Sequence, residues 1–244
     1  MAKEIGEEYI VKIQKEVTDK CERCKDMCVG DGIVVIDYFC PICKAKFWEL
    51  YKIARLRIPV GFIGKTIEDK SVMQRANNYI ANFSPGFNLL IKGRSGLGKT
   101  LLATLILRQL TGEYRNGDFF AVANYINYRQ NLYDDGVEDL EEIASNTDLL
   151  VLDDLGSEHG ALDSEGQAAY VMSRLSLLLK SRFDNKKTTI ITTNLDAINL
   201  KRRYGDAVCS VLASYAVINM TGEINYRERV AKDLNSKLEG GVSK

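Results

Sequence analysis

The sequence has no excess of charge of either sign, a single histidine and no long apolar run. Its 33 basic and 33 acidic residues cancel to a formal net charge of +0, so no overall field draws the chain towards nucleic acid or a membrane surface, and any DNA contact needs a local patch. No apolar run approaches the length that spans a bilayer. The only histidine, His159, is interpreted as a loop residue rather than as a general base.

Residues 1–17 carry acidic side chains throughout their apolar stretch, which argues against a secretory signal. We therefore expect a cytoplasmic protein with no membrane partner. In that compartment the six cysteines favour metal binding or reactive thiols over disulfides. A chain of 244 residues with 45% hydrophobic and 27% charged residues is typical of a globular protein with one large domain, or with a compact domain and a small appendage.

The most informative stretch is residues 87–100, FNLLIKGRSGLGKT, where a short apolar run leads into a glycine-rich loop and a helix-favouring run follows. The spacing G-x-x-x-x-G-K-T between a strand and a helix is that of a P-loop. Glycines let backbone N–H groups crowd around phosphates, the following helix adds its positive dipole end, and the lysine adds a point charge. The predicted ATP-binding residues are Gly93, Arg94, Ser95, Gly96, Leu97, Gly98, Lys99 and Thr100.

A second apolar run, residues 148–154, ends in two carboxylates. Downstream of a P-loop this pattern indicates a Walker B strand, in which Asp153 holds Mg²⁺ through water, together with the Thr100 hydroxyl, and Asp154 polarises the attacking water. A third strand ends at Asn194, which has the right side chain for a sensor of the γ-phosphate. The same asparagine is also suited to cap a helix that starts near Leu195.

Two C-x-x-C pairs lie near the N-terminus, separated by fifteen residues, and predict a four-thiolate zinc site made by Cys21, Cys24, Cys40 and Cys43. Four thiolates leave no open coordination position, so the zinc is expected to be structural. Residues 33–39 read as β-structure, which fits a zinc ribbon. Cys28 either replaces Cys24 as a ligand or is a free thiol, and Cys209 is read as a small apolar residue.

The whole pattern predicts an α/β fold, because strands that alternate with helices form a parallel sheet with its nucleotide at the carboxyl ends of the strands. A break at residues 57–61 suggests a zinc-binding domain over 1–56 and a nucleotide-binding domain over 57–244. Helices are expected at 4–17, 44–57, 66–82, 137–144, 164–181 and 225–238, and strands at 87–91, 119–123, 148–154, 188–192 and 216–218.

The motifs GRSGLGKT, LLVLDDLGSE and TTN, preceded by IP and a helix, resemble the RecA-like AAA+ core of bacterial and phage helicase loaders of the DnaC/DnaI type and of the related IstB transposition helpers. The resemblance covers roughly residues 58–230. It implies an ATPase that binds ATP, Mg²⁺ and single-stranded DNA, docks on the replicative helicase through its N-terminal region, and self-associates on the helicase ring. The zinc module is similar in placement to the helicase-binding domain of DnaI-type loaders.

One departure from the family concerns arginines that reach into a neighbouring subunit's ATP site. The resemblance leads us to expect these arginines at positions 207 and 211, but the sequence has Ala207 and Val211 there. Either hydrolysis is weak, or Arg202 or Arg203 substitutes, and both arginines also suit an ordinary solvated helix face. The function predicted from the sequence is therefore an ATP-dependent helicase loader, with a transposition helper or a weakly hydrolysing ATP-binding adaptor as alternatives.

The DNA-binding prediction rests on Tyr125, Tyr128 and Arg129, which lie where the resemblance puts a family-specific insertion. Aromatic rings stack on unpaired bases and arginine pairs with phosphate, which is the combination that single strands require. Tyrosines at helical spacing are also common in cores, and that alternative stays open.

Overall fold

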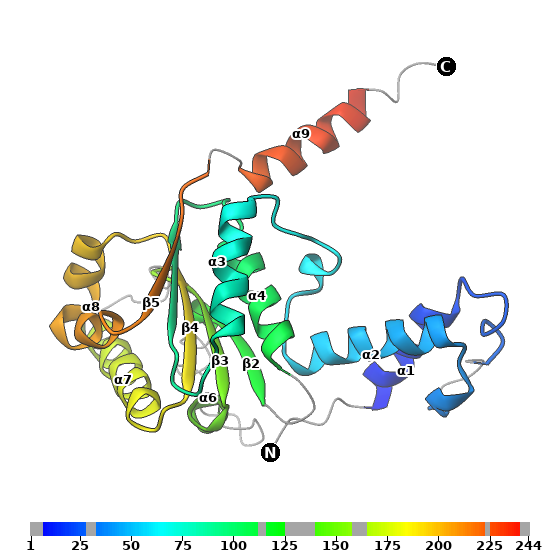
Figure 1. Cartoon of the computed structure of the whole chain (residues 1–244), viewed down its shortest axis with the longest axis horizontal. Helices are drawn as coiled ribbons and strands as arrows, with labels where there is room; N and C mark the ends of the chain where they lie inside the picture. Colours follow the sequence, from blue (N-terminus) through cyan, green and yellow to red (C-terminus); the bar gives the residue numbers. More distant parts are fainter. Residues whose placement is uncertain are drawn as a thin grey trace. The chain divides into compact units, whose positions relative to one another are not determined.

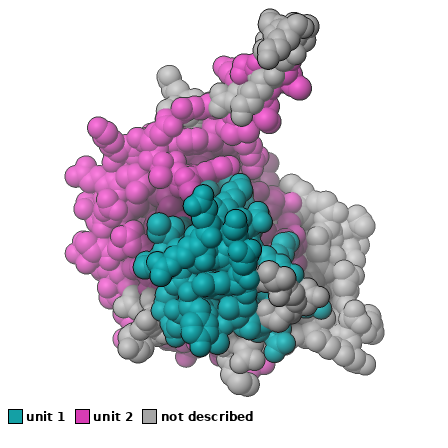
Figure 2. All heavy atoms as spheres, turned by 90° about the vertical axis from the view of Figure 1, so that its right-hand side faces the viewer, with its two compact units in different colours: residues 1–63 teal, residues 64–244 magenta. Residues whose placement is uncertain are grey.

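The computed structural model describes residues 7–27, 33–111, 116–124, 140–157, 165–222 and 225–239. The chain forms two compact units, residues 1–63 and 64–244 (Figure 2). The sequence suggests a break near residue 56, directly after a helix that ends at Arg55, whereas the units divide between Ile63 and Gly64. Within the described ranges, no helix is both long and apolar enough to cross a membrane.

The larger unit is built on a parallel sheet of five strands in the order β2-β3-β4-β1-β5. The strands are β1 Leu89–Gly93, β2 Gly117–Ala121, β3 Leu149–Leu155, β4 Thr188–Thr193 and β5 Ala216–Met220. Strands β3 and β4 are buried along almost their whole length, which is why their sequences are continuous runs with little polar alternation. The predicted parallel α/β sheet is confirmed.

Helices cover both faces of this sheet (Figure 1). They are α3 Lys70–Ala81 and α4 Lys99–Leu110 on one face, α6 Leu140–Asn146, α7 Glu165–Asp184 and α8 Ala197–Leu212 on the other, and α9 Tyr226–Glu239 after β5. Aspartates set two of the starts: the Asp69 side chain accepts from two backbone N–H groups at the beginning of α3, and Asp196 accepts from the Asn199 N–H at the beginning of α8.

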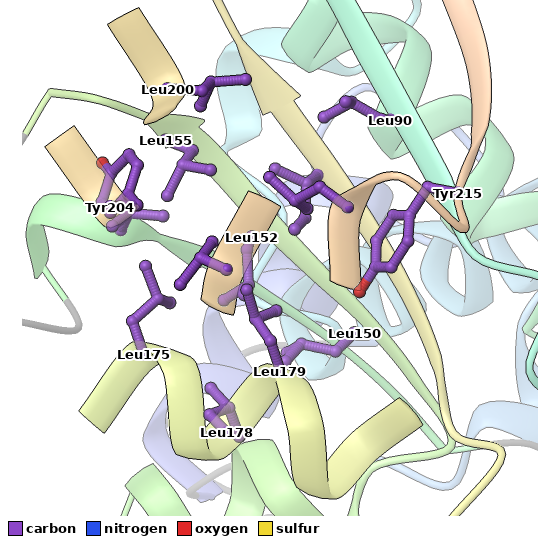
Figure 3. Packing of buried hydrophobic residues seen from close by; sticks show 14 of the residues in the cluster. Leu90, Leu150, Leu152, Leu155, Leu175, Leu178, Leu179, Leu200, Tyr204 and Tyr215 are labelled. Atoms are coloured by element: carbon purple, nitrogen blue, oxygen red, sulfur yellow. The ribbon is translucent and has the colours of Figure 1, made fainter. Parts of the chain in front are cut away.

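The core under α6, α7 and α8 shows how the strands orient their side chains. Leu150 and Leu152 of β3 belong to a buried cluster with Leu175 and Leu179 of α7, and Figure 3 shows these side chains turned towards one another. Alternate residues of a strand point to opposite faces, so Leu149, Val151 and Asp153 face α4. The pleat of β3 therefore directs the Asp153 carboxylate towards the helix that follows the P-loop.

A buried arginine connects the elements at the end of this core that lies away from Asp153. Arg182, near the end of α7, is only 1% exposed. Its guanidinium donates to the Thr189 hydroxyl and to the carbonyls of Thr147 and Thr188 at 2.6–2.9 Å, and also to the Ala144 carbonyl. Burial lowers the pKa of Arg182 to about 10, so the side chain stays charged near neutral pH while it ties α6, α7 and β4 together.

The smaller unit packs helix α1 Glu7–Thr18 against helix α2 Pro41–Arg55, with short 3-10 turns at Ile36–Tyr38 and Val60–Phe62. Its core contains Ile13, Val17, Phe39 and Phe47. Phe47 is buried and Leu50, Tyr51 and Ala54 pack partly buried around it, so these residues form the inner face of α2.

The predicted β-structure over residues 33–39 is wrong, and the ribbon description of this unit with it. In the described part of the smaller unit these residues form irregular chain and the 3-10 turn, and no strand is present. The buried Gln14 amide occupies the place of a partner strand, because it donates to the Val34 carbonyl at 2.6 Å and accepts the Val34 N–H at 3.1 Å. Pro41, at the first turn of α2, then places the second cysteine pair on a helix start.

Candidate nucleotide site and cysteine cluster

The P-loop lies where the sequence predicts it, between β1, which ends at Gly93, and α4, which begins at Lys99. Gly96 and Gly98 adopt left-handed φ values of 84° and 89°, a conformation that side-chain-bearing residues rarely take. A Cβ on Gly98 would also lie 2.9 Å from the Ile67 side chain. The loop therefore turns tightly into the helix, whose first N–H groups and positive dipole end make an anion site.

Lys99 is held close over this loop. Its side chain is buried and its ammonium donates to the Arg94 carbonyl at 2.9 Å. Burial lowers the pKa of Lys99, and the nearby carboxylates of Asp154 and Asp153 act in the opposite direction. The lysine thus brings a positive charge between the glycine-rich loop and the acidic end of β3.

The acidic end of β3 faces the helix start as the pleat requires. The Thr100 hydroxyl donates to the Asp153 Oδ2 at 3.1 Å. Burial raises the pKa of Asp153, while the hydrogen bonds from Thr192 and Thr100 lower it. A hydroxyl and a carboxylate held together are oxygen ligands of the kind Mg²⁺ takes beside a nucleotide, so the residues present fit the predicted role of Thr100 and Asp153.

Strand β4 contributes a residue that sequence reasoning did not select. The Thr192 hydroxyl donates to the Asp153 Oδ1 at 2.7 Å and accepts the Asp154 backbone N–H at 2.8 Å. Asn194, the residue that the sequence suggests as a sensor, is exposed just beyond the strand. A threonine in an apolar strand gives no local signal of such a role, because its partners are almost forty residues away in the chain.

The start of α9 reaches the P-loop, which the sequence also did not predict. The Tyr226 N–H donates to the Gly96 carbonyl at 2.9 Å, and the Tyr226 hydroxyl accepts the Glu68 N–H at 3.0 Å. The Arg227 guanidinium donates to the Ser95 hydroxyl at 3.2 Å. The C-terminal helix therefore adds a cation beside the predicted phosphate site.

The two arginines suggested as substitutes lie on α8, before a kink at Gly205, whose φ is 73°. Arg202 is exposed, whereas Arg203 is half-buried with its guanidinium 5.8 Å from the centre of the Tyr204 ring. Ala207 is exposed and Val211 is half-buried on the helix after the kink. The role of both arginines stays a prediction, and Tyr125, Tyr128, Arg129, His159 and Cys28 lie outside the described residues.

The four predicted cysteines come together in the smaller unit. The sulfurs of Cys21, Cys24, Cys40 and Cys43 all lie within 4.8 Å of one another. Cys21 and Cys24 sit on turns after α1, whereas Cys40 precedes α2 and Cys43 lies in its first turn. Two segments that are separate in sequence thus converge on one small cluster.

The geometry of this cluster fits zinc. Four sulfurs held tetrahedrally at about 2.3 Å from zinc are about 3.8 Å apart, and the Cys21 and Cys40 sulfurs are separated by 3.8 Å. The Cys43 N–H lowers the pKa of the Cys40 thiol to about 7, whereas burial raises the pKa of Cys43. Bound zinc would deprotonate all four thiols and crosslink the two segments.

The five-stranded parallel sheet, the glycine-rich loop before α4 and the acidic end of β3 together define the P-loop fold of the AAA+ class. No family model and no curated protein matches the sequence. The structure is similar to that of the DnaC helicase loader, with a TM-score of 0.53 and 28% identity over 64% of this chain and 92% of that chain. It is also similar to DnaI, with a TM-score of 0.54 and 19% identity over 68% of this chain and 89% of that chain.

A third similar structure is the replication initiator DnaA bound to AMPPCP and single-stranded DNA. Its TM-score is 0.52 and its identity 13%, over 70% of this chain and 52% of that chain. The DnaI and DnaA likenesses concern the fold alone. The DnaC likeness confirms the resemblance to DnaC/DnaI-type loaders, and the other two confirm the fold.

Proposed function

We propose that this chain is an ATP-dependent loader of a replicative hexameric helicase. The observation that carries the proposal is the contact of Thr100 with Asp153 at 3.1 Å beneath a P-loop, in a fold that resembles the DnaC helicase loader. The contact supports a site for Mg²⁺ and nucleotide, and the likeness to the DnaC helicase loader supports their use in helicase loading.

The proposed roles within the nucleotide site follow from the charges and donors of the chain. Lys99 and the N-terminus of α4 bind the phosphates, and Mg²⁺ would be held by the Thr100 hydroxyl directly and by Asp153 through water. Bound Mg²⁺ would neutralise charge on the β- and γ-phosphates. Asp154 polarises the attacking water, and Asn194 contacts that water or the γ-phosphate.

The smaller unit is proposed to bind the helicase. It has its own core and its own cysteine cluster, so it is organised separately from the sheet. It also exposes large apolar side chains, among them Tyr38 at 70%, Ile42 at 80% and Trp48 at 50%. Contiguous apolar patches on a surface mark sites that bind other proteins, and we propose that these side chains belong to such a patch.

Single-stranded DNA is proposed to contact the segment of Tyr125, Tyr128 and Arg129. The support is the chemistry of stacking and phosphate pairing, together with the DNA-bound state of a similar AAA+ structure. Loss of single-strand affinity in a Tyr128→Ala, Arg129→Ala variant would agree with this assignment, and wild-type affinity would contradict it. The chain is further proposed to self-associate on the helicase ring.

The partner is tested by capture with the full chain immobilised. The replicative hexameric helicase and a transposase from the same source are offered separately, each with ATP and with ADP. Retention of the helicase supports the loader, and retention of the transposase alone would replace it with a transposition helper. ATP turnover is measured in the presence of DNA and the retained partner. Binding without turnover would indicate an adaptor, which Ala207 and Val211 favour.

A further inference from the structure

The end of β3 is irregular, and the irregularity concerns both predicted acidic residues. Leu152 pairs with Ile191, but the next pair joins Leu155 with Thr193. Two residues of β3, Asp153 and Asp154, therefore lie opposite a single residue of β4. This is the arrangement of a β-bulge, which re-aims side chains and recurs next to active sites.

The single residue opposite the bulge is Thr192, and its hydroxyl contacts both members of the acidic pair. It donates to the Asp153 carboxylate at 2.7 Å and accepts the Asp154 N–H at 2.8 Å. Thr192 is 1% exposed, so both hydrogen bonds of its hydroxyl are shielded from bulk solvent. The Thr192 hydroxyl is thus a donor to the Asp153 side chain and an acceptor for the Asp154 backbone.

The backbone of Asp154 needs such support. Its φ is +60°, a left-handed conformation that is uncommon for residues with a side chain and persists where neighbouring structure fixes it. The hydrogen bond from the Asp154 N–H to Thr192 holds this conformation. It thereby sets the direction in which the Asp154 side chain leaves the strand.

Strand order explains why β4 can supply this residue. β4 lies between β1, which leads into the P-loop, and β3, which carries the acidic pair. Thr192 pairs with Ile91 on the P-loop side. The Asp153 carboxylate is consequently held from two directions, by Thr100 at Oδ2 and by Thr192 at Oδ1.

We propose that Thr192 is a positioning residue of the nucleotide site, whose hydroxyl fixes the Asp153 carboxylate for magnesium and the Asp154 backbone for the attacking water. The inference rests on the proposed ATPase function and adds a residue to it. Thr192 touches neither nucleotide nor metal in this account. It acts through the two aspartates.

The test compares Thr192→Val with Thr193→Val. Thr193 is the matched control because it is the adjacent buried threonine of β4, and its hydroxyl serves the Leu155 carbonyl and the Leu195 N–H instead of the acidic pair. Affinity for a fluorescent ATP analogue is measured with and without Mg²⁺. Steady-state turnover is measured beside it, and the melting temperature of the free chain reports folding.

Loss of a hydrogen bond to a charged group corresponds to a change of about tenfold or more in a binding constant. We expect Thr192→Val to lose about that factor from the gain in affinity that Mg²⁺ confers, and to lower kcat more than it raises KM. Thr193→Val should retain the magnesium effect within about twofold. Thr192→Ser should restore the magnesium effect, since it keeps the hydroxyl.

If Thr192→Val fails to fold, Thr192→Cys takes its place, because a thiol occupies similar space and is a weak donor. An equal magnesium effect in the folded Thr192 and Thr193 variants would overturn the inference while leaving the ATPase proposal intact. A wild-type chain that binds no ATP would instead remove the proposed function itself.

Discussion

Tyr226 donates its backbone N–H to the carbonyl of Gly96 at 2.9 Å, so α9 begins against the P-loop. Asn225, directly before it, leaves no room for a side chain at Gly96, because a Cβ there would lie 2.1 Å from the asparagine oxygen. The P-loop and the start of α9 therefore pack closely against each other, and substitutions on α9 should change the affinity for the nucleotide.

Replacement of Arg227 by alanine should weaken ATP binding about tenfold, the effect of losing one charged hydrogen bond. Its guanidinium contacts Ser95 of the P-loop at 3.2 Å and can pair with phosphate. Arg229→Ala is the matched control, because that arginine pairs with Glu68 at 2.7 Å instead. Titration with a fluorescent ATP analogue compares the two, and equal affinities would contradict a role for Arg227.

The cysteine cluster should bind one zinc ion per chain. Elemental analysis of the purified full chain checks the content. Cys43→Ser should lose the metal and unfold the smaller unit, since a structural zinc site contributes its binding energy to folding. ATP affinity, which belongs to the other unit, should change by less than about twofold. Cys209→Ser should keep the zinc, and a metal-free wild type that stays folded would contradict the assignment.

Replacement of Arg182 by methionine should destabilise the larger unit by about 3 kcal/mol or more, because it leaves buried carbonyls of Thr147 and Thr188 without their donor. Arg202→Met, at an exposed position, should change stability by less than about 0.5 kcal/mol. Denaturant unfolding followed by circular dichroism measures both. Similar midpoints for the two variants would show that the buried network contributes little.

The arginine that completes the ATP site from a neighbouring subunit is expected to be Arg202, which is exposed, rather than Arg203, which packs on Tyr204. Arg202→Ala should then lower ATPase activity by about tenfold or more when DNA and helicase are present. Lys201→Ala, which breaks an exposed ion pair with Asp206, serves as the control. Undiminished activity in an Arg202→Ala, Arg203→Ala protein would remove the substitution and leave a weakly hydrolysing chain.

Local spacing predicted those parts of the molecule that local chemistry determines. The P-loop and the acidic strand each lie within one short segment, and their apolar runs require burial. Lys99 and Asp153 could therefore be placed at the carboxyl ends of strands in a parallel sheet. The cluster of four cysteines was predicted correctly because each C-x-x-C pair fits within one turn and brings its two sulfurs together. These inferences needed no knowledge of distant contacts.

The remaining features depend on contacts that sequence spacing does not encode. Thr192 meets Asp153 only because β4 lies beside β3, and Arg227 meets Ser95 across more than one hundred residues of chain. The predicted strand over residues 33–39 was wrong because the Gln14 side chain, on another element, satisfies the Val34 backbone. Each case was decided by a partner far away in the sequence.

The central claim is that nucleotide bound at the P-loop drives the placement of a helicase ring on DNA. It is tested most directly by loading the replicative hexameric helicase onto closed single-stranded circles and measuring unwinding of an annealed strand. The wild-type chain with ATP is predicted to promote unwinding, and Lys99→Ala, which removes the buried P-loop ammonium, is predicted to abolish it. Equal unwinding with wild type, with Lys99→Ala and without the chain would contradict the account.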